Sequence, residues 1–302
     1  MIDPQTRAAV EAVPVASLLP PRAQSRVESL DGRVAILDAL DLGATADGDR
    51  ACVAVVRVLG SPEHRDVVVP GRMHEGQFVR DAGVARYLRS QESAAFTVEI
   101  IGSGIPAGHA REIDVDQSND SVIVGDDASA VMVKWQLDAV PSPAPSRLRS
   151  LMGTDLTPPL RGVVRWRDAA GVERTLMTAA DYLPGADDGW TWAVELVRSH
   201  ARGERVDAIE PFAVLGEMTA RMHLAFAGSG VESWDGAALS RLHDSCRAHL
   251  DEALRLIDGD EGDRLRARAD RIAARMDALA EINSTPVIDI HGDFHIGQVL
   301  RW

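Results

Sequence analysis

The stretch HGDFHIGQVL, residues 291–300, decides how the rest of the chain is interpreted. It places two histidines and an aspartate within five positions, and a glutamine and an apolar run follow them. Three ionisable groups so close together are more typical of a functional loop than of a simple connection between strands. Three kinds of loop fit this composition.

Two of these need no phosphate chemistry. A structural turn would satisfy both histidines by hydrogen bonds. A metal centre would use His291, Asp293 and His295, whose side chains are of the types that bind zinc and iron. The remaining histidines are scattered singly, without a second cluster such as H-E-x-x-H. The metal centre is therefore the less favoured of the functional alternatives.

The third interpretation is a phosphoryl-transfer loop. Protein kinases carry a catalytic loop written H-R-D-x-x-x-x-N. His291, Asp293 and Gln298 have the same spacing, with glutamine in place of asparagine. The aspartate can accept or orient the proton of an acceptor hydroxyl, and a side-chain carbonyl oxygen five residues later can hold Mg²⁺.

A second feature is the single lysine. Of the 32 basic residues only Lys134 is a lysine, and it lies in the apolar stretch AVMVKW, residues 130–135. One explanation is a lysine that reaches solvent from a strand by its long stem. A kinase of this type, however, requires a lysine on an N-terminal strand to bind nucleotide phosphates. Because the loop and the lysine agree, we favour the kinase interpretation.

The strand signals of the chain lie mainly in its first 183 residues and predict antiparallel strands. Three β-branched runs lie between residues 33 and 70, and further runs cover 96–104, 121–125, 130–135, 162–166 and 174–183. The short polar turn between 121–125 and 130–135 predicts a hairpin. A helix is predicted near 76–88, and a loop at the proline- and serine-rich residues 140–146.

The pattern becomes helical from Trp190 onward. Residues 211–226 place Leu215, Met218, Met222 and Phe226 on one apolar face. Two further helices are predicted at about 237–257 and 263–281, and then a short buried strand at 285–290. Strands followed by helices predict an α+β fold in two lobes.

Composition excludes several classes of protein. The chain is 45% hydrophobic and 26% charged, which is ordinary for a globular protein. A net charge of −14 argues against nucleic acid or an anionic membrane as a partner. No apolar run is long enough to span a bilayer, and the first residues lack the basic and apolar regions of a signal peptide, so we expect none. Cys52 and Cys246 are interpreted as unpaired thiols of a reducing compartment, so we expect a cytoplasmic protein.

At this point the sequence resembles a known family. HGDFHIGQVL, with glutamine where most of the superfamily has asparagine, is similar to the loop of the maltokinase-like branch of the aminoglycoside-phosphotransferase-like kinases. That branch includes kinases of glucosamine. Further similarities are VMVKW for the lysine strand, DYLPGADDGW for the hinge and LGEMTARMHLAFA for a C-lobe helix. The resemblance implies a bilobal protein-kinase-like fold with a cap subdomain at 1–92, a β-rich N-lobe at 93–184 and a helical C-lobe at 185–302.

The resemblance also implies roles for individual residues. Asp293 would be the catalytic aspartate, Gln298 a Mg²⁺ ligand, and Lys134 a contact to the α- and β-phosphates of ATP. The backbone around Asp181 and Leu183 would face adenine. The two histidines of the loop, His291 and His295, would serve as its scaffold.

Two departures from the family stand out. Kinases usually pair the lysine with a glutamate on the following helix, but no glutamate lies between Lys134 and Glu173. Asp138 and Asp155 are the acids in the segment where it should lie. The second metal-binding aspartate, in a D-F-D-like motif, and the acceptor-sugar site are expected beyond Trp302, in an incomplete C-lobe. We therefore expect the 302 residues to belong to a longer chain.

The expected function is ATP- and Mg²⁺-dependent phosphorylation of a sugar hydroxyl. The N-terminus lacks the R-W-F-A-G-K-like stretch associated with maltokinases, which narrowly favours glucosamine over maltose as the acceptor. The alternatives are an aminoglycoside-type small-molecule kinase and a non-catalytic nucleotide-binding protein. The expected partner is a sugar or amino sugar, with no nucleic acid and no membrane.

Overall fold

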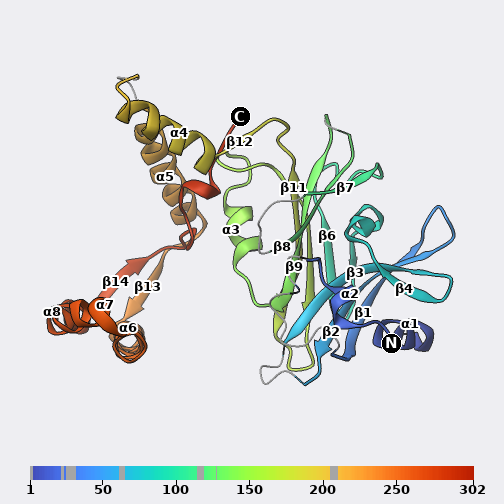
Figure 1. Ribbon diagram of the computed structural model, residues 1–302, viewed down its shortest axis with the longest axis horizontal. Helices are drawn as coiled ribbons and strands as arrows, with labels where there is room; N and C mark the ends of the chain where they lie inside the picture. The colour runs from blue at the N-terminus through green and yellow to red at the C-terminus, as the bar shows by residue number, and fades with distance from the viewer. Residues whose placement is uncertain are drawn as a thin grey trace. The chain divides into compact units, whose positions relative to one another are not determined.

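A computed structural model describes residues 3–21, 24, 32–60, 65–113, 119–126, 128–204 and 210–302. The fold is mixed α+β, with a large curled antiparallel sheet and C-terminal helices (Figure 1). The chain divides into two compact units. The sheet unit is Met1–Ala208 with Phe294–Trp302, and the helical unit is Ile209–Asp293.

The sheet unit is built on an antiparallel sheet of eleven described strands. The β-branched residues of these strands suit a pleated, buried surface. Eight strands follow the order β1-β2-β3-β9-β11-β10-β6-β5, while β4 pairs with β3, and β8 pairs with both β7 and β9. Their bounds are β1 Val34–Ala44, β2 Arg50–Val58, β3 Asp66–His74, β4 Gln77–Arg80, β5 Gln91–Glu92, β6 Phe96–Ile100, β7 Ala110–Glu112, β8 Asn119–Val124, β9 Val131–Val140, β10 Leu160–Arg167 and β11 Glu173–Asp181.

Short helices and two small strands complete the sheet unit. They are α1 Pro4–Glu11, α2 Val15–Leu18, the 3₁₀ helix η2 Ala82–Tyr87, α3 Ala144–Ser150, β12 Asp187–Asp188, α4 Gly189–Ala201, the 3₁₀ helix η4 Ile296–Gln298 and β15 Leu300–Arg301. The last residues of the chain rejoin this unit because β15 pairs antiparallel with β12.

Strand β9 shows how the core determines the direction of the Lys134 side chain. Its buried residues alternate with half-buried ones, as expected for a strand with one face on the core. Trp135 is fully buried on the core face, and its indole N–H donates to the carbonyl oxygen of Ala82 at 2.9 Å. Lys134 therefore points to the opposite face of the sheet.

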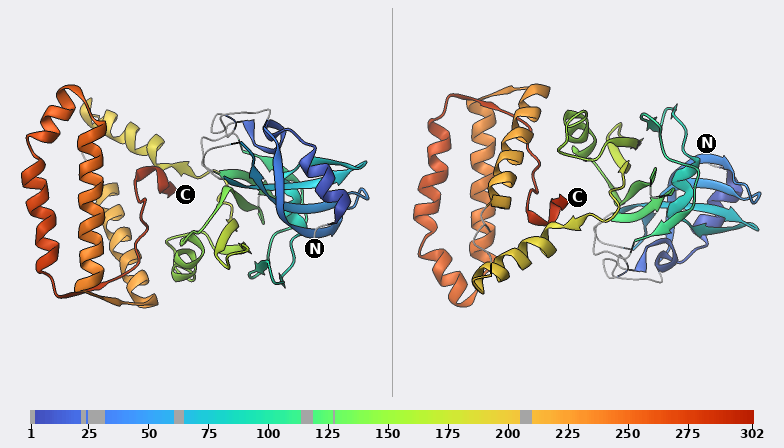
Figure 2. Two further views of the ribbon diagram at one scale, coloured as in Figure 1. Left: turned by 90° about the horizontal axis from the view of Figure 1, so that it is seen from below. Right: turned by 90° about the horizontal axis from the view of Figure 1, so that it is seen from above.

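The helical unit contains four α-helices among its described residues. Its elements are α5 Glu210–Ser229, β13 Glu232–Asp235, α6 Gly236–Leu256, α7 Gly259–Arg266, α8 Ala269–Asp277, the 3₁₀ helix η3 Ala278–Glu281 and β14 Ser284–Val287. The predicted apolar stripe of α5 is confirmed at Met222 and Phe226, which are buried. Helices α6 and α8 pack against each other (Figure 2). No helix in the described ranges has both the length and the apolar character needed to cross a membrane.

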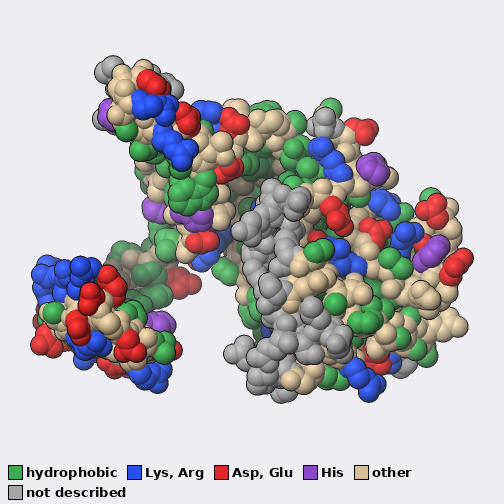
Figure 3. Space-filling model, in the orientation of Figure 1, with side chains coloured by type: hydrophobic (Ala, Val, Ile, Leu, Met, Phe, Trp, Pro, Cys, Tyr) green, Lys and Arg blue, Asp and Glu red, His purple; other side chains and the backbone are tan. Residues whose placement is uncertain are grey.

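Charged side chains of both signs are interspersed over the face drawn in Figure 3. On α7 they form ion pairs one turn apart, such as Arg264 with Glu261 at 2.8 Å and Arg266 with Asp263 at 2.9 Å. Exposed pairs of this kind add little stability. On this face the net charge of −14 is therefore not gathered into one acidic patch.

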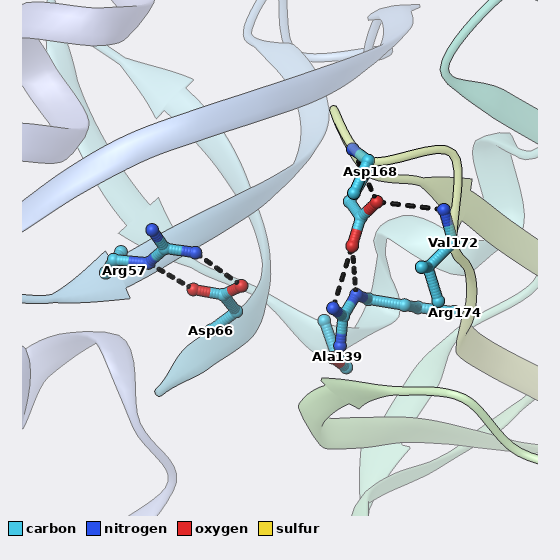
Figure 4. Close-up of polar contacts among 7 residues, drawn as sticks. Arg57, Asp66, Ala139, Asp168, Val172 and Arg174 are labelled. Atoms are coloured by element: carbon cyan, nitrogen blue, oxygen red, sulfur yellow. Dashed lines mark hydrogen bonds and ion pairs between the residues drawn. The ribbon is translucent and has the colours of Figure 1, made fainter. Parts of the chain in front are cut away.

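The turn between β10 and β11 is held by one carboxylate (Figure 4). Asp168 accepts from the backbone N–H groups of Ala170 and Val172, both at 2.9 Å, and from the Arg174 guanidinium at 2.7 Å. The Arg174 guanidinium also donates to the carbonyl oxygen of Ala139 on β9 at 3.0 Å. The contact with Arg174 and the backbone donors lower the pKa of Asp168. The Arg174 guanidinium, held by Asp168, thereby links the hairpin to the lysine strand.

Two sequence predictions in the sheet unit were partly wrong. The helix expected at 76–88 is instead strand β4 followed by η2. Glu75 and Gly76 both have positive φ, at 48° and 80°, and form a tight turn that folds β4 back onto β3. The loop expected at 140–146 ends early, since α3 begins at Ala144 with a proline in its first turn.

Two predictions in the helical unit also require correction. The single helix expected at 263–281 is divided into α7, α8 and η3, with α7 ending at Arg266. The strand expected at 285–290 is β14, which spans only Ser284–Val287, pairs with β13 and is not buried. Ile290 is 52% exposed, so the approach to the HGDFH loop is a surface segment. The predicted boundaries at 92/93 and 184/185 stay predictions.

Candidate functional site

Lys134 lies on a central strand of the sheet, where its side chain is half-buried. On β9 it faces Ser121 of β8 on one side and Thr178 of β11 on the other. Burial lowers the pKa of the Lys134 ammonium below its ordinary value of 10.5, because desolvation disfavours the charged form. Among the described residues no carboxylate forms an ion pair with Lys134. The site therefore holds a partly desolvated cation without a counter-ion from this part of the protein.

The acids near this lysine in sequence do not compensate it. Asp138, on the same strand, pairs with Arg65, whose guanidinium donates to Oδ2 at 2.9 Å. Helix α3, the first helix after β9, contains arginines and no acid. Its Arg149 pairs with Glu99 of β6. Kinases usually have a glutamate on the helix that follows the lysine strand, whereas α3 carries two arginines and no acid.

The hinge predicted to face adenine follows β11. The Asp181 carboxylate pairs with the Arg161 guanidinium, which donates to Oδ2 at 2.8 Å. The backbone N–H of Asp181 donates to the carbonyl oxygen of Pro159. The N–H of Tyr182 donates to the carbonyl oxygen of Ala130 at 2.9 Å. The N–H of Leu183 makes no hydrogen bond within the described ranges. Of the two predicted residues, Leu183 is the one that offers a backbone donor.

The HGDFH loop crosses from one unit to the other. His291 and Asp293 belong to the helical unit, whereas His295 and Gln298 belong to the sheet unit. The turn is made possible by Gly292, whose φ is 84°. The Asp293 side chain is exposed after the β13–β14 ribbon and is available to solvent.

Gln298 lies in the short helix η4, which His295 caps. The Nδ1 atom of His295 accepts from the N–H of Gly297 at 3.1 Å, and its carbonyl oxygen accepts from the N–H of Gln298 at 2.9 Å. The other ring nitrogen, Nε2, lies 3.5 Å from the side-chain amide of Gln298. The structure thus brings His295 and Gln298 into contact.

Helix η4 is seated on the first turn of α4. A Cβ on Gly189 would collide with the carbonyl oxygen of Ile296, and it would come within 3.0 Å of the carbonyl oxygen of Val299. The Trp190 and His295 rings lie 6.3 Å apart between centroids. Sequence analysis did not identify Gly189. The only signal was a glycine directly after Asp188, the N-cap of α4.

Residues after η4 fasten it to the hinge connection. Arg301 pairs with Asp187 at 2.6 Å, and the Trp302 indole N–H donates to the carbonyl oxygen of Pro184 at 3.2 Å. The Arg301 guanidinium also lies 5.9 Å from the ring centre of Trp192. The segment that carries Gln298 is therefore held by the chain that directly follows Leu183.

The metal-centre alternative finds no support in the geometry. In the described part of the chain, no group of three or more His, Cys, Asp or Glu side chains is arranged to hold a metal ion. The carbonyl oxygen of Gln298 is a ligand type that Mg²⁺ accepts, alongside water and substrate phosphates. The residues present therefore fit a magnesium ion that is held mainly by its nucleotide.

A half-buried lysine on a central antiparallel strand, a hinge whose Leu183 N–H has no acceptor among the described residues, and an aspartate–glutamine loop are typical of kinase-type phosphotransferases. No protein-family model matches the chain. A glucosamine kinase from Streptacidiphilus jiangxiensis is 43% identical over 219 residues, which cover 69% of this chain and 49% of that protein. A glucosamine kinase from Mycolicibacterium smegmatis is 38% identical over 207 residues, 63% of this chain and 48% of that protein.

Solved structures agree with these relatives. A glucosamine kinase in complex with glucosamine, ADP and inorganic phosphate matches with a TM-score of 0.74 and 34% identity, covering 100% of this chain and 70% of that one. A second glucosamine kinase structure, crystal form B, matches with a TM-score of 0.75 and 35% identity, covering 98% and 69%. The chain belongs to the glucosamine kinase family. It spans about half the length of the curated relatives that it matches.

Proposed function

We propose that this protein transfers the γ-phosphoryl group of ATP to a hydroxyl group of glucosamine. The observation that carries the proposal is Lys134, the only lysine of the chain, half-buried and partly desolvated without a counter-ion among the described residues. A desolvated ammonium on a central strand is a suitable partner for nucleotide phosphates. The match to a relative bound to glucosamine and ADP supports both the nucleotide and the acceptor.

Each residue has a defined task in this proposal. The Lys134 ammonium binds the α- and β-phosphates, and the Leu183 N–H, with the backbone at Asp181, binds adenine. The Asp293 carboxylate accepts the proton of the acceptor hydroxyl. At the same time the hydroxyl oxygen of the sugar bonds to the γ-phosphorus, and the bond between the γ-phosphorus and the ADP oxygen breaks. Gln298 would hold Mg²⁺ through Oε1, and the bound ion would neutralise phosphate charge.

The finer description of the fold belongs to the same proposal. We infer a bilobal kinase with a cap at 1–92, an N-lobe at 93–184 and a helical C-lobe at 185–302, acting in the cytoplasm. The 70% coverage of the glucosamine kinase structure supports this arrangement. Lys134 and the hinge then belong to the N-lobe, and Asp293 and Gln298 to the C-lobe.

The test measures ADP release with ATP and Mg²⁺ across glucosamine, glucose, maltose and an aminoglycoside. We expect turnover with glucosamine, lost in Asp293→Asn, with ADP binding retained. Asp289→Asn is the matched control, because Asp289 is an exposed acid four residues earlier. Turnover with the aminoglycoside alone would identify an aminoglycoside, and not glucosamine, as the acceptor. Full activity of Asp293→Asn, or ADP binding without any turnover, would reject the catalytic assignment.

A further inference from the structure

The contact between His295 and Gln298 carries information about the orientation of the Gln298 amide. His295 Nδ1 accepts the Gly297 N–H, so Nδ1 uses its lone pair and bears no hydrogen. A neutral imidazole has one N–H, which must then be on Nε2. That N–H faces the amide end of Gln298 at 3.5 Å.

Two donors cannot bond to each other, so this geometry selects one orientation of the amide. The amide nitrogen of Gln298 lies on the side of His295 Nε2. A half-turn about the last torsion of the Gln298 side chain exchanges this nitrogen for the carbonyl oxygen at little cost. With Oε1 facing His295, the Nε2–H has an acceptor. The carbonyl oxygen then keeps a second lone pair for another partner.

We propose that His295 is a positioning residue that fixes the Gln298 carbonyl oxygen for a divalent cation. This inference rests on the proposed function, in which Gln298 is a Mg²⁺ ligand. Side chains that orient a metal ligand commonly affect metal affinity by about 10–100-fold. The backbone of η4, which carries both residues, packs closely against Gly189 of α4.

A capping role alone would explain the His295–Gly297 bond but not the contact with Gln298. The two roles can be separated by substitution. In His295→Asn the side-chain oxygen occupies nearly the position of Nδ1 and can accept the Gly297 N–H, as asparagine does at helix N-termini. It cannot reach Gln298 as Nε2 does. His295→Ala removes both contacts.

The experiment measures ADP affinity by calorimetry with and without Mg²⁺, and the unfolding midpoint, for both variants. His109→Asn is the control, because His109 is an exposed loop histidine of the same unit. We expect His295→Asn to keep the midpoint and the Mg²⁺-free ADP affinity while requiring about tenfold more Mg²⁺. His295→Ala should show the same Mg²⁺ defect and a lower midpoint. In the native protein, ¹⁵N NMR should show the hydrogen on Nε2.

The opposite results are equally clear. A normal Mg²⁺ requirement in His295→Asn, or a hydrogen on Nδ1, would leave His295 as a helix cap only. An ADP affinity that is the same with and without Mg²⁺ in the native protein would also overturn the inference. A Mg²⁺ defect in His295→Asn together with absent glucosamine turnover would keep the inference and reject the proposed function instead.

Discussion

At the scale of one residue, Lys134 shows how a partly desolvated charge weakens the fold that carries it. Its ammonium is buried on β9, and no acid in the described part of the chain forms an ion pair with it. Burial of a charge without a counter-ion disfavours the folded state. A bound phosphate would supply that counter-ion, so nucleotide binding and folding stability should be linked at this residue.

Lys134→Met is therefore expected to stabilise the protein while impairing nucleotide binding. Methionine has a similar unbranched shape and no charge to desolvate. We expect a higher unfolding temperature and an ADP affinity reduced by at least tenfold. Gln136→Met is the matched control, since Gln136 lies two residues further along the same strand. A destabilised Lys134→Met that binds ADP normally would contradict this account.

The pH dependence of this difference has a defined sign. The folded protein releases the Lys134 proton at a lower pH than the unfolded chain, whose lysine titrates near 10.5. The cost of the charge is thus largest below the folded-state pKa of Lys134 and declines as the pH rises from that pKa toward 10.5. The stability gap between Lys134→Met and the native protein should narrow over that range in denaturation experiments. A gap that widens with pH would be incompatible with a buried ammonium.

At the scale of elements, the contact of η4 with α4 depends on the absence of a side chain at Gly189. Gly189→Ala should cost about 1–3 kcal/mol, as overpacking commonly does, because the new methyl group meets the Ile296 carbonyl. Gly216 in α5 has open space around the same position, and Gly216→Ala should stabilise by about 0.5–1 kcal/mol. Urea denaturation measures both. Equal effects of the two substitutions would refute the steric explanation.

The β10–β11 hairpin should depend on pH through Asp168. Its pKa is depressed from the ordinary 3.8, first by Arg174 and then by backbone donors. The stabilisation is therefore present above the unfolded pKa and is lost as the pH falls through the folded value. Asp168→Asn should be less stable than the native protein at pH 6, and the difference should close below about pH 4. Asp47→Asn, in an exposed turn, is the control, and a difference that persists in acid would exclude this cause.

Elements also show which parts of the fold and site could be predicted from sequence. β-Branched runs bounded by turn residues identified most of the longer strands, and the short polar turn identified the Val124–Val131 hairpin. The pairing of β13 with β14 was not predictable, because it joins segments about fifty residues apart and no local period encodes such partners. The Gly189 contact was missed for the same reason. His295 and Gln298 were found because they are close in sequence.

At the scale of the whole molecule, the two units have cores of different size. The sheet unit contains two buried apolar clusters. Helix α8 buries none of its described side chains, while α5 leaves Leu224 72% exposed. Stability within one chain varies with local burial. The helical unit is therefore expected to open more readily than the sheet unit.

Hydrogen exchange can measure this difference. Amides of β9 and β11 should be the most protected, and those of α7 and α8 should exchange fastest among the described helices and strands. Thermal unfolding should accordingly deviate from a two-state transition. Uniform protection across α8 and β9 would show that both units unfold together.

The solitary lysine also makes the protein a convenient substrate for chemical labelling. Apart from the terminal α-amine, an acylating reagent would find one primary amine in the chain. Its depressed pKa increases the fraction of neutral, nucleophilic amine at mildly alkaline pH. A fluorescent ester would therefore label the terminal α-amine and Lys134, and ADP should protect Lys134 from labelling if the phosphates bind there.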